Sequence, residues 1–87
     1  LTKFAASEYG KDGIRVNSIN PGFHRTNILN SLPPEQRKER EDLMIKNTAL
    51  RRIAETEELK GLAVWLASDA SSYVTGQIIT QDGGLTL

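Results

Sequence analysis

The run Ile-Arg-Val-Asn-Ser-Ile-Asn-Pro-Gly-Phe-His-Arg-Thr occupies residues 14–26 of the chain. Its first half is rich in the β-branched residues that favour a strand, whereas Pro21 cannot donate a backbone hydrogen bond and Gly22 lets the chain turn. We therefore expect a strand over residues 14–20 and a loop from Pro21 onward. In an open parallel sheet, ligands bind beyond the carboxyl ends of the strands. The loop at residues 21–26 is thus the best candidate for a binding site.

A second strand is predicted over residues 77–82, where apolar β-branched residues are followed by Gly83 and Gly84. The helical region between the two strands is too long for a hairpin and fits a parallel crossover. A parallel sheet needs more than two strands and a cover on both faces. We therefore expect an α/β fold whose sheet is incomplete within these residues, and we take the chain for a segment of a longer protein.

Hydrophobic periodicity and charge patterning predict three helices, over residues 1–9, 35–46 and 57–68. Gly10 supplies the stop after the first helix. Two adjacent prolines open the second helix, which starts with almost no apolar surface and is expected to face solvent. Its charges are spaced for pairs one turn apart, Arg37 with Glu41 and Lys38 with Asp42.

The third helix, residues 57–68, has two apolar sides. Thr56 is predicted as its N-cap. One stripe is expected to pack on the sheet, and it consists of Leu59, Leu62, Ala63 and Leu66. The opposite side is small and apolar where a solvent face would be charged, and it consists of Gly61, Val64, Trp65 and Ser68. Such a surface requires a second partner.

The loop Pro21-Gly22-Phe23-His24-Arg25-Thr26 and the strand before it resemble a motif of the short-chain dehydrogenase/reductase family. In that family, Pro-Gly-x-(Ile or Val)-x-Thr lines the nicotinamide end of a dinucleotide, and His24 departs from it by replacing the aliphatic residue. Further matching segments follow in the family's order and spacing: Leu1-Thr2-Lys3-Phe4-Ala5, Glu57-Glu58-Leu59, Leu66-Ala67-Ser68-Asp69-Ala70, Val74-Thr75-Gly76-Gln77 and Asp82-Gly83-Gly84. Their order over nearly the whole chain makes the match specific.

The resemblance implies the C-terminal part of a doubly wound, Rossmann-type domain that binds NAD or NADP. Its activity would be that of an oxidoreductase interconverting an alcohol and a ketone by hydride transfer. The cofactor-binding residues that it implies are Pro21, Gly22, Phe23, His24 and Thr26. The family's catalytic Tyr-x-x-x-Lys motif belongs upstream of the matched helix and is not in this sequence, so we assign no catalytic residue here.

Individual residues of this region have more than one interpretation. The His24 ring can serve as an acid or base at the nicotinamide end. The family, however, uses this position through its backbone N–H, which leaves the side chain free to vary. The Thr26 hydroxyl is expected to contact the carboxamide or pyrophosphate, and it can also cap a helix that starts at Asn27. Residues 27–50 are predicted to form a substrate lid, the alternative being an ordinary surface connection.

Two classes of function remain open. The first is the oxidoreductase, for which the pattern of residues 23–32 is closest to reductases of sugar acids, polyols or 3-oxoacyl compounds, with a small-molecule alcohol or ketone as substrate. The second is a non-catalytic remnant or interaction module that retains only an oligomerisation surface. The resemblance also implies a homotetramer or homodimer that pairs through the helix at 57–68 and the strand at 77–82.

Composition excludes other classes of function. The chain has 11 basic and 11 acidic residues, so nothing in its charge points to nucleic acid or an anionic membrane as a partner. It has no cysteine and a single histidine, and we therefore expect no metal site. The absence of cysteine fits a reducing compartment, which makes the cytoplasm the expected location.

Overall fold

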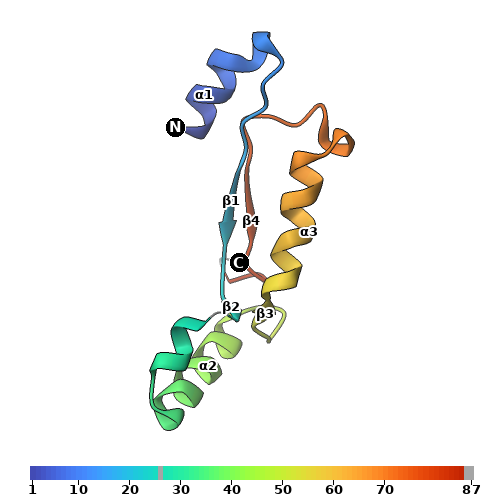
Figure 1. Ribbon diagram of the computed structural model, residues 1–87. Coiled ribbons are helices and arrows are strands. Elements are labelled where there is room, and N and C mark those ends of the chain that lie inside the picture. The colour runs from blue at the N-terminus through green and yellow to red at the C-terminus, as the bar shows by residue number, and fades with distance from the viewer. Residues whose placement is uncertain (26, 86–87) are drawn as a thin grey trace.

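The computed structural model describes residues 1–25 and 27–85, and Figure 1 shows an elongated arrangement of short elements. In chain order, the described elements are the helix α1 (Thr2–Tyr9), the 3-10 helix η1 (Gly10–Asp12), the strands β1 (Ser18–Pro21) and β2 (His24–Arg25), the 3-10 helix η2 (Asn27–Ser31), the helix α2 (Pro34–Asn47), the strand β3 (Ala54–Glu55), the helix α3 (Thr56–Ala67), the 3-10 helix η3 (Asp69–Ser71) and the strand β4 (Ile78–Gln81). The predicted α/β class and the positions of the three helices are confirmed.

The strands β1 and β4 lie side by side and run parallel, with Ser18 opposite Ile78 and Pro21 opposite Gln81. The chain between them includes α3, which lies along one side of the pair (Figure 1). The predicted parallel crossover is therefore confirmed. Both strands point toward the end of the molecule that holds α2, so their carboxyl ends lie beside the loop that follows Pro21.

The strand predicted from residue 14 begins only at Ser18, and the reason lies in side-chain hydrogen bonds. The Val16 N–H donates to Thr75 Oγ1 at 3.1 Å instead of to a backbone carbonyl. The Asn17 amide occupies the next place, because its Nδ2 donates to the Val74 carbonyl at 3.0 Å and its Oδ1 accepts from the Gln77 N–H at 3.1 Å. Side chains thus take several of the ladder positions just before β1, while the Val16 carbonyl still accepts from the Gly76 N–H at 2.8 Å.

The predicted end of this strand at residue 20 is also wrong by one residue, since β1 includes Pro21. In a parallel ladder, alternate residues of a strand bond to a given neighbour. The N–H group of Ser18 donates to the carbonyl of Gln77, just before β4, and that of Gly22 donates to the carbonyl of Gln81 in β4, at 2.9 Å each. Residue 21 is not one of the alternate positions whose N–H bonds to β4, so a proline without an N–H is tolerated there.

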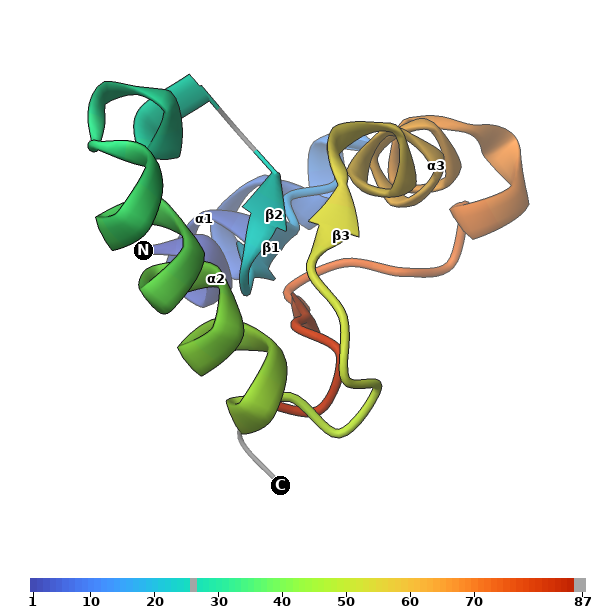
Figure 2. The ribbon, with the colours of Figure 1, turned by 90° about the horizontal axis from the view of Figure 1, so that it is seen from below.

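A second, very small sheet was not predicted. β2 pairs with β3 in parallel, with His24 opposite Ala54 and Arg25 opposite Glu55. Figure 2 shows this pair between α2 and α3. Two-residue strands carry too little periodicity to be found in a sequence. The pairing matters because it ties the loop after β1 to the segment that enters α3.

Two details of α3 differ from the sequence prediction. Its N-cap is Glu55 rather than Thr56, because Glu55 and Glu58 form a reciprocal capping box in which the Glu58 carboxylate accepts from the Glu55 N–H at 2.9 Å. In the predicted core stripe, the three leucines are half-buried, but Ala63 is exposed at the edge of a groove that borders Ile19.

The charged helix α2 begins with Pro34 in its first turn, as predicted. Within the described residues, however, Glu41 pairs with Arg25 at 3.2 Å rather than with Arg37 one turn away. Arg25 lies in β2 and also bonds to Glu55 of β3 at 3.2 Å. The predicted solvent-facing ion pair is thus replaced by a contact that connects α2 to the small sheet.

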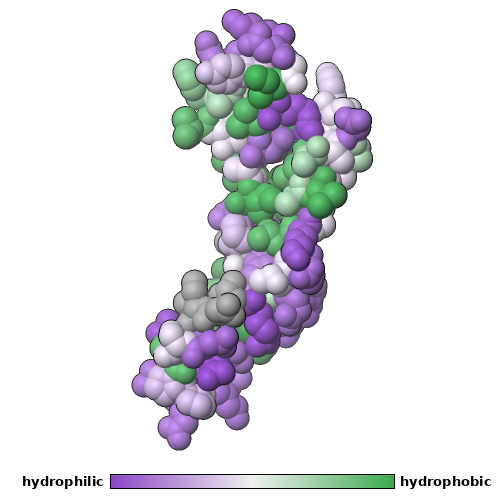
Figure 3. Space-filling model, viewed as in Figure 1, coloured by the Kyte–Doolittle hydropathy of each residue, from purple (hydrophilic) through white to green (hydrophobic). Residues whose placement is uncertain are grey.

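The chain leaves much apolar surface open. Its radius of gyration is 16.3 Å, whereas a compact domain of 87 residues has a value of about 12 Å. Apolar side chains gather on the face formed by the strands and α3, while polar groups cover α2 (Figure 3). Phe4 is 69% exposed and Ile78 is 55% exposed. Nothing in the described part of the chain covers these side chains.

We therefore predict that the 87 residues expressed alone do not fold stably, because two parallel strands with one covering helix leave apolar faces in water. Circular dichroism during heating should show a gradual change without a cooperative transition. The complete protein, meaning this chain together with the rest of its own polypeptide, is the control and should unfold sharply. A sharp transition in the isolated chain would contradict the prediction.

Candidate functional site

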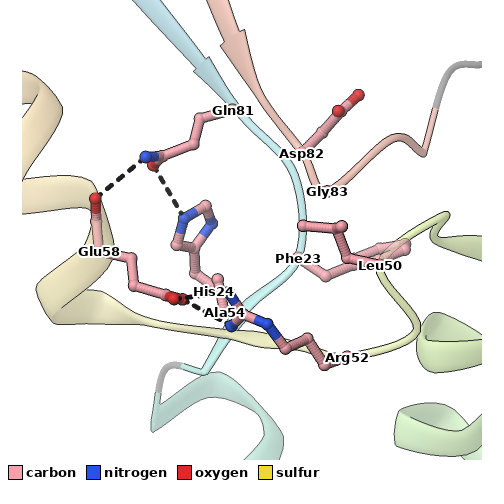
Figure 4. Close-up of a pocket in the computed structure, with 9 residues that line it drawn as sticks. All are labelled: Phe23, His24, Leu50, Arg52, Ala54, Glu58, Gln81, Asp82 and Gly83. Carbon is pink, nitrogen blue, oxygen red and sulfur yellow. Dashed lines mark hydrogen bonds and ion pairs between the residues drawn. The ribbon is translucent and has the colours of Figure 1, made fainter.

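The loop at residues 21–25 lies at the carboxyl ends of β1 and β4 and takes part in two pockets. The Arg52 pocket has a volume of about 180 Å³ and is lined by Phe23, His24, Leu50, Arg52, Ala54, Glu58, Gln81, Asp82 and Gly83 (Figure 4). The Met44 pocket has a volume of about 330 Å³ and is lined by Pro21, Gly22, Phe23, His24, Leu29, Met44 and Leu59. Phe23 and His24 of the loop belong to both pockets.

Four of the five residues predicted for the site come together in the structure. Pro21, Gly22, Phe23 and His24 all line the Met44 pocket, and the last two also line the Arg52 pocket. The fifth, Thr26, lies outside the described residues. The loop thus presents a continuous wall of the predicted residues to the Met44 pocket.

The backbone of Gly22 is packed tightly against the end of β4. A Cβ atom placed on Gly22 would lie 2.6 Å from both the Cα and the Cβ of Asp82. Such a distance is far below ordinary contact, and one of the two atoms belongs to the backbone and cannot rotate away. Only glycine allows the loop to turn here while its N–H donates to the Gln81 carbonyl at 2.9 Å.

His24 is held by two hydrogen-bonding partners. Its Nδ1 lies 3.3 Å from the carbonyl oxygen of Gly22, and its Nε2 lies 3.3 Å from Oε1 of Gln81. Gln81 in turn donates from Nε2 to the carbonyl of Glu58 at 3.0 Å. No partner for this histidine could be identified from the sequence, because Gln81 and Glu58 come from β4 and α3. Finding them required the register of β1 against β4.

Arg52 and Glu58 form a two-pronged ion pair at the edge of the Arg52 pocket, with distances of 2.9 and 2.7 Å. The hydrogen bond from Arg52 lowers the pKa of the Glu58 carboxyl, and the bond from the Glu55 N–H lowers it further. The same pairing, first through its hydrogen bond, raises the pKa of Arg52. Both groups remain charged across the physiological pH range. Arg52, which was not predicted from the sequence as a site residue, lies in the pocket wall.

Elements from residues 27–50 form the far side of the Met44 pocket. Leu29, in η2, is buried, and Met44 of α2 is half-buried. Arg25 joins this part of the chain to the loop, because it bonds both to Glu41 of α2 and to Glu55 of β3. A ligand in this pocket would therefore touch the site loop on one side and the predicted lid on the other.

Residues 1–25 and 27–85 contain neither a metal-binding cluster nor a membrane-spanning helix. No three histidine or acidic side chains in this part of the chain gather in a way that could hold a metal ion. None of its helices has the length and apolar character needed to cross a membrane.

Sequence comparison finds relatives along the whole chain. Residues 1–86 match the family model described as enoyl-(acyl carrier protein) reductase. Gluconate 5-dehydrogenase of Gluconobacter oxydans (strain 621H) is 39% identical over 87 residues, which cover 100% of this chain and 33% of that protein. Meso-2,3-butanediol dehydrogenase of Serratia marcescens is 41% identical over 86 residues, 99% of this chain and 33% of that protein.

Solved structures show the same fold. A 4-hydroxyisoleucine dehydrogenase complexed with NADH superposes with a TM-score of 0.86 at 33% identity, covering 98% of this chain and 34% of its own. A putative gluconate dehydrogenase from Agrobacterium tumefaciens gives a TM-score of 0.85 at 37% identity, covering 97% of this chain and 32% of its own. The chain thus spans about a third of the length of the relatives it matches.

The tight contact at Gly22 gives a direct test of the loop. In the complete protein, we expect Gly22→Ala to lower the free energy of unfolding by about 1–3 kcal/mol, because the added methyl group overlaps the Asp82 backbone. Gly10→Ala is the matched control, since its Cβ meets nothing within 4 Å and its φ of −57° suits alanine. Urea unfolding measures both, and equal stabilities would show that the close approach is not a constraint.

Proposed function

Because the chain belongs to the short-chain dehydrogenase/reductase family, as its resemblance predicted, we propose that it is the C-terminal third of an oxidoreductase that interconverts an alcohol and a ketone by hydride transfer. The observation that carries this proposal is the position of the loop at residues 21–25. It lies at the carboxyl ends of two parallel strands, which is where ligands bind in open α/β sheets.

The cofactor in this proposal is NAD or NADP, and the residues present fit its nicotinamide end. The Met44 pocket, at about 330 Å³, is within the size range of small-molecule sites. Pro21, Gly22, Phe23 and His24 would hold the ring from one side, and Thr26 would add a hydroxyl to the carboxamide or pyrophosphate. When bound, the dinucleotide supplies or accepts the hydride. The complex of the related 4-hydroxyisoleucine dehydrogenase with NADH supports this assignment.

The substrate in this proposal is a small alcohol or ketone. Relatives named for gluconate and meso-2,3-butanediol support a polyol or sugar acid. Residues 27–50 would act as its lid, because Leu29 and Met44 line the Met44 pocket opposite the loop. The proton-transferring tyrosine and its lysine would come from the part of the complete protein upstream of α1.

Replacing Thr26 with valine tests the cofactor site, because the change removes one hydroxyl and keeps the β-branched shape. In the complete protein, we expect Thr26→Val to weaken binding of NADH or NADPH by about 0.5–1.5 kcal/mol, the value of one neutral hydrogen bond. Fluorescence titration measures the affinity. Thr56→Val makes the same chemical change at an exposed position of α3 outside both pockets, and it serves as the control.

The outcomes of this experiment separate the two classes of function. Binding of a dinucleotide, together with its oxidation or reduction in the presence of polyols or their ketones, supports the oxidoreductase. A complete protein that binds neither dinucleotide would be the non-catalytic remnant. If Thr26→Val binds as tightly as the unchanged protein, Thr26 is not part of the site.

We further propose that α3 and β4 form a contact between subunits, giving a homodimer or homotetramer. On the outer side of α3, Val64 is 67% exposed and Trp65 is 40% exposed. A Cβ on Gly61 would meet nothing within 4 Å, so a second backbone can approach closely there. Adjacent exposed apolar side chains on one helix commonly mark a contact, and a second copy across a twofold axis is the usual partner.

Introducing a large charge tests this contact. In the complete protein, we expect Gly61→Arg to lower the molecular mass measured by light scattering, because the guanidinium would be driven into an apolar interface. Gly10→Arg is the control, since its position is equally open but lies away from the outer side of α3. If Gly61→Arg keeps the mass and stability of the unchanged protein, the outer side of α3 does not pair subunits.

A further inference from the structure

Both ring nitrogens of His24 face hydrogen-bond acceptors. Nδ1 lies 3.3 Å from the Gly22 carbonyl oxygen, and a carbonyl can only accept. Nε2 lies 3.3 Å from the Gln81 side chain, on the side of its Oε1 atom. Figure 4 shows the imidazole directed toward the Gln81 amide. The ring thus joins its own loop to the last residue of β4.

The orientation of the Gln81 amide is set by a third group. Its Nε2 donates to the carbonyl of Glu58 at 3.0 Å, in the first turn of α3. If the Gln81 amide were rotated by 180°, its oxygen would face the Glu58 carbonyl oxygen. Its nitrogen would then face the Nε2 atom of His24. The oxygen Oε1 must therefore point at His24, and this makes Gln81 an acceptor for the ring.

A neutral imidazole carries one N–H and can donate to only one of these two acceptors, whereas an imidazolium donates to both. We propose that His24 is a positioning residue whose doubly protonated ring clamps the cofactor-lining loop onto β4 and α3. This inference rests on the proposed function, because the clamped loop is the wall of the proposed dinucleotide site. Loss of one proton breaks one of the two bonds and leaves a ring lone pair facing an oxygen.

The charged groups around the ring come from each element packed against it. Glu58 of α3 is the nearby acid, and Arg52 neutralises it through a two-pronged pair. Asp82, after β4, points away from the ring in Figure 4. Arg25 and Glu55, from the small sheet, pair with each other at 3.2 Å. The Glu58 carboxylate still interacts with the ring through its charge, in addition to its pair with Arg52. The direct contacts of the ring are its hydrogen bonds with Gly22 and Gln81.

The clamp gives cofactor binding a pH dependence with a defined sign. Both bonds are present when the ring carries two protons, and one is lost when it carries a single proton. Histidine changes charge between about pH 5 and 8, so the loop should be held less firmly at the upper end of that range. An aliphatic residue, as the family pattern has at this position, makes neither bond and would show no such dependence.

The test compares dinucleotide affinity across the range from about pH 5.5 to 8.5 in the complete protein. We expect the dissociation constant for NADH or NADPH, whichever binds, to rise by about two- to tenfold with pH in the unchanged protein, the equivalent of one hydrogen bond. His24→Leu should remove that rise. Gln81→Met keeps the histidine and removes its acceptor, so it should remove the rise as well. Parallel profiles in all three proteins would overturn the clamp.

A second measurement does not depend on cofactor binding. Hydrogen-exchange protection of residues 21–25, corrected for the intrinsic effect of pH, should fall as pH rises in the unchanged protein and stay flat in the two variants. The ¹⁵N shifts of the His24 ring should show protons on both nitrogens at low pH. If no dinucleotide binds, the proposed function is wrong. The exchange and ¹⁵N data still test whether His24 holds the loop against β4. Equal protection in all three proteins, or a neutral ring at low pH, would overturn the clamp.

Discussion

The parallel pairing of β1 with β4 is the constraint on which the candidate site depends, because it joins two segments that lie about 60 residues apart in the chain. Two strands of four residues each contribute few ladder bonds, so their register must be held from outside the ladder. Arg15 holds it at one end. Its guanidinium donates to the carbonyls of Leu66 and Ser68 at 2.9 and 3.2 Å and to that of Val74 at 3.1 Å. The end of α3 is thereby tied to the entry of β1.

At the other end of the ladder, the register is held by the fit of Gly22 against Asp82. A shift of one residue would place a different side chain of β4 against the glycine and would turn Gln81 to the opposite face. His24 would then lose the Gln81 side chain and keep only the Gly22 carbonyl. The turn after β1, the Gln81 contact and the entry into α3 are therefore consequences of a single alignment, and Arg15 and Gly22 stabilise that alignment from its two ends.

The sequence predicted what depends on local chemistry. The two main strands, the three helices and the Pro-Gly break all follow from periodicity and backbone preference, and the structure has them close to the expected residues. What the sequence could not supply depends on contacts between distant segments. The Asn17 side chain bonds where a backbone ladder bond was expected, and Glu55 rather than Thr56 caps α3. The strands β2 and β3 pair through only two residues each. The partners of His24 were likewise hidden, because a lone histidine in a sequence does not indicate which strand end will face it.

The helix α3 connects the two parts of the molecule to which function is assigned. Its first turn contacts the site, since the Glu58 carbonyl accepts from Gln81 and Leu59 lines the Met44 pocket. Its later turns carry the exposed side chains Val64 and Trp65 proposed for the subunit contact. A helix transmits displacement along its axis because its backbone bonds make it stiff. A subunit docked on the outer side of α3 would therefore fix the position of the Glu58 carbonyl, and with it the Gln81 amide that orients His24. Assembly and the shape of the loop that we propose to line the cofactor would be linked through this one helix.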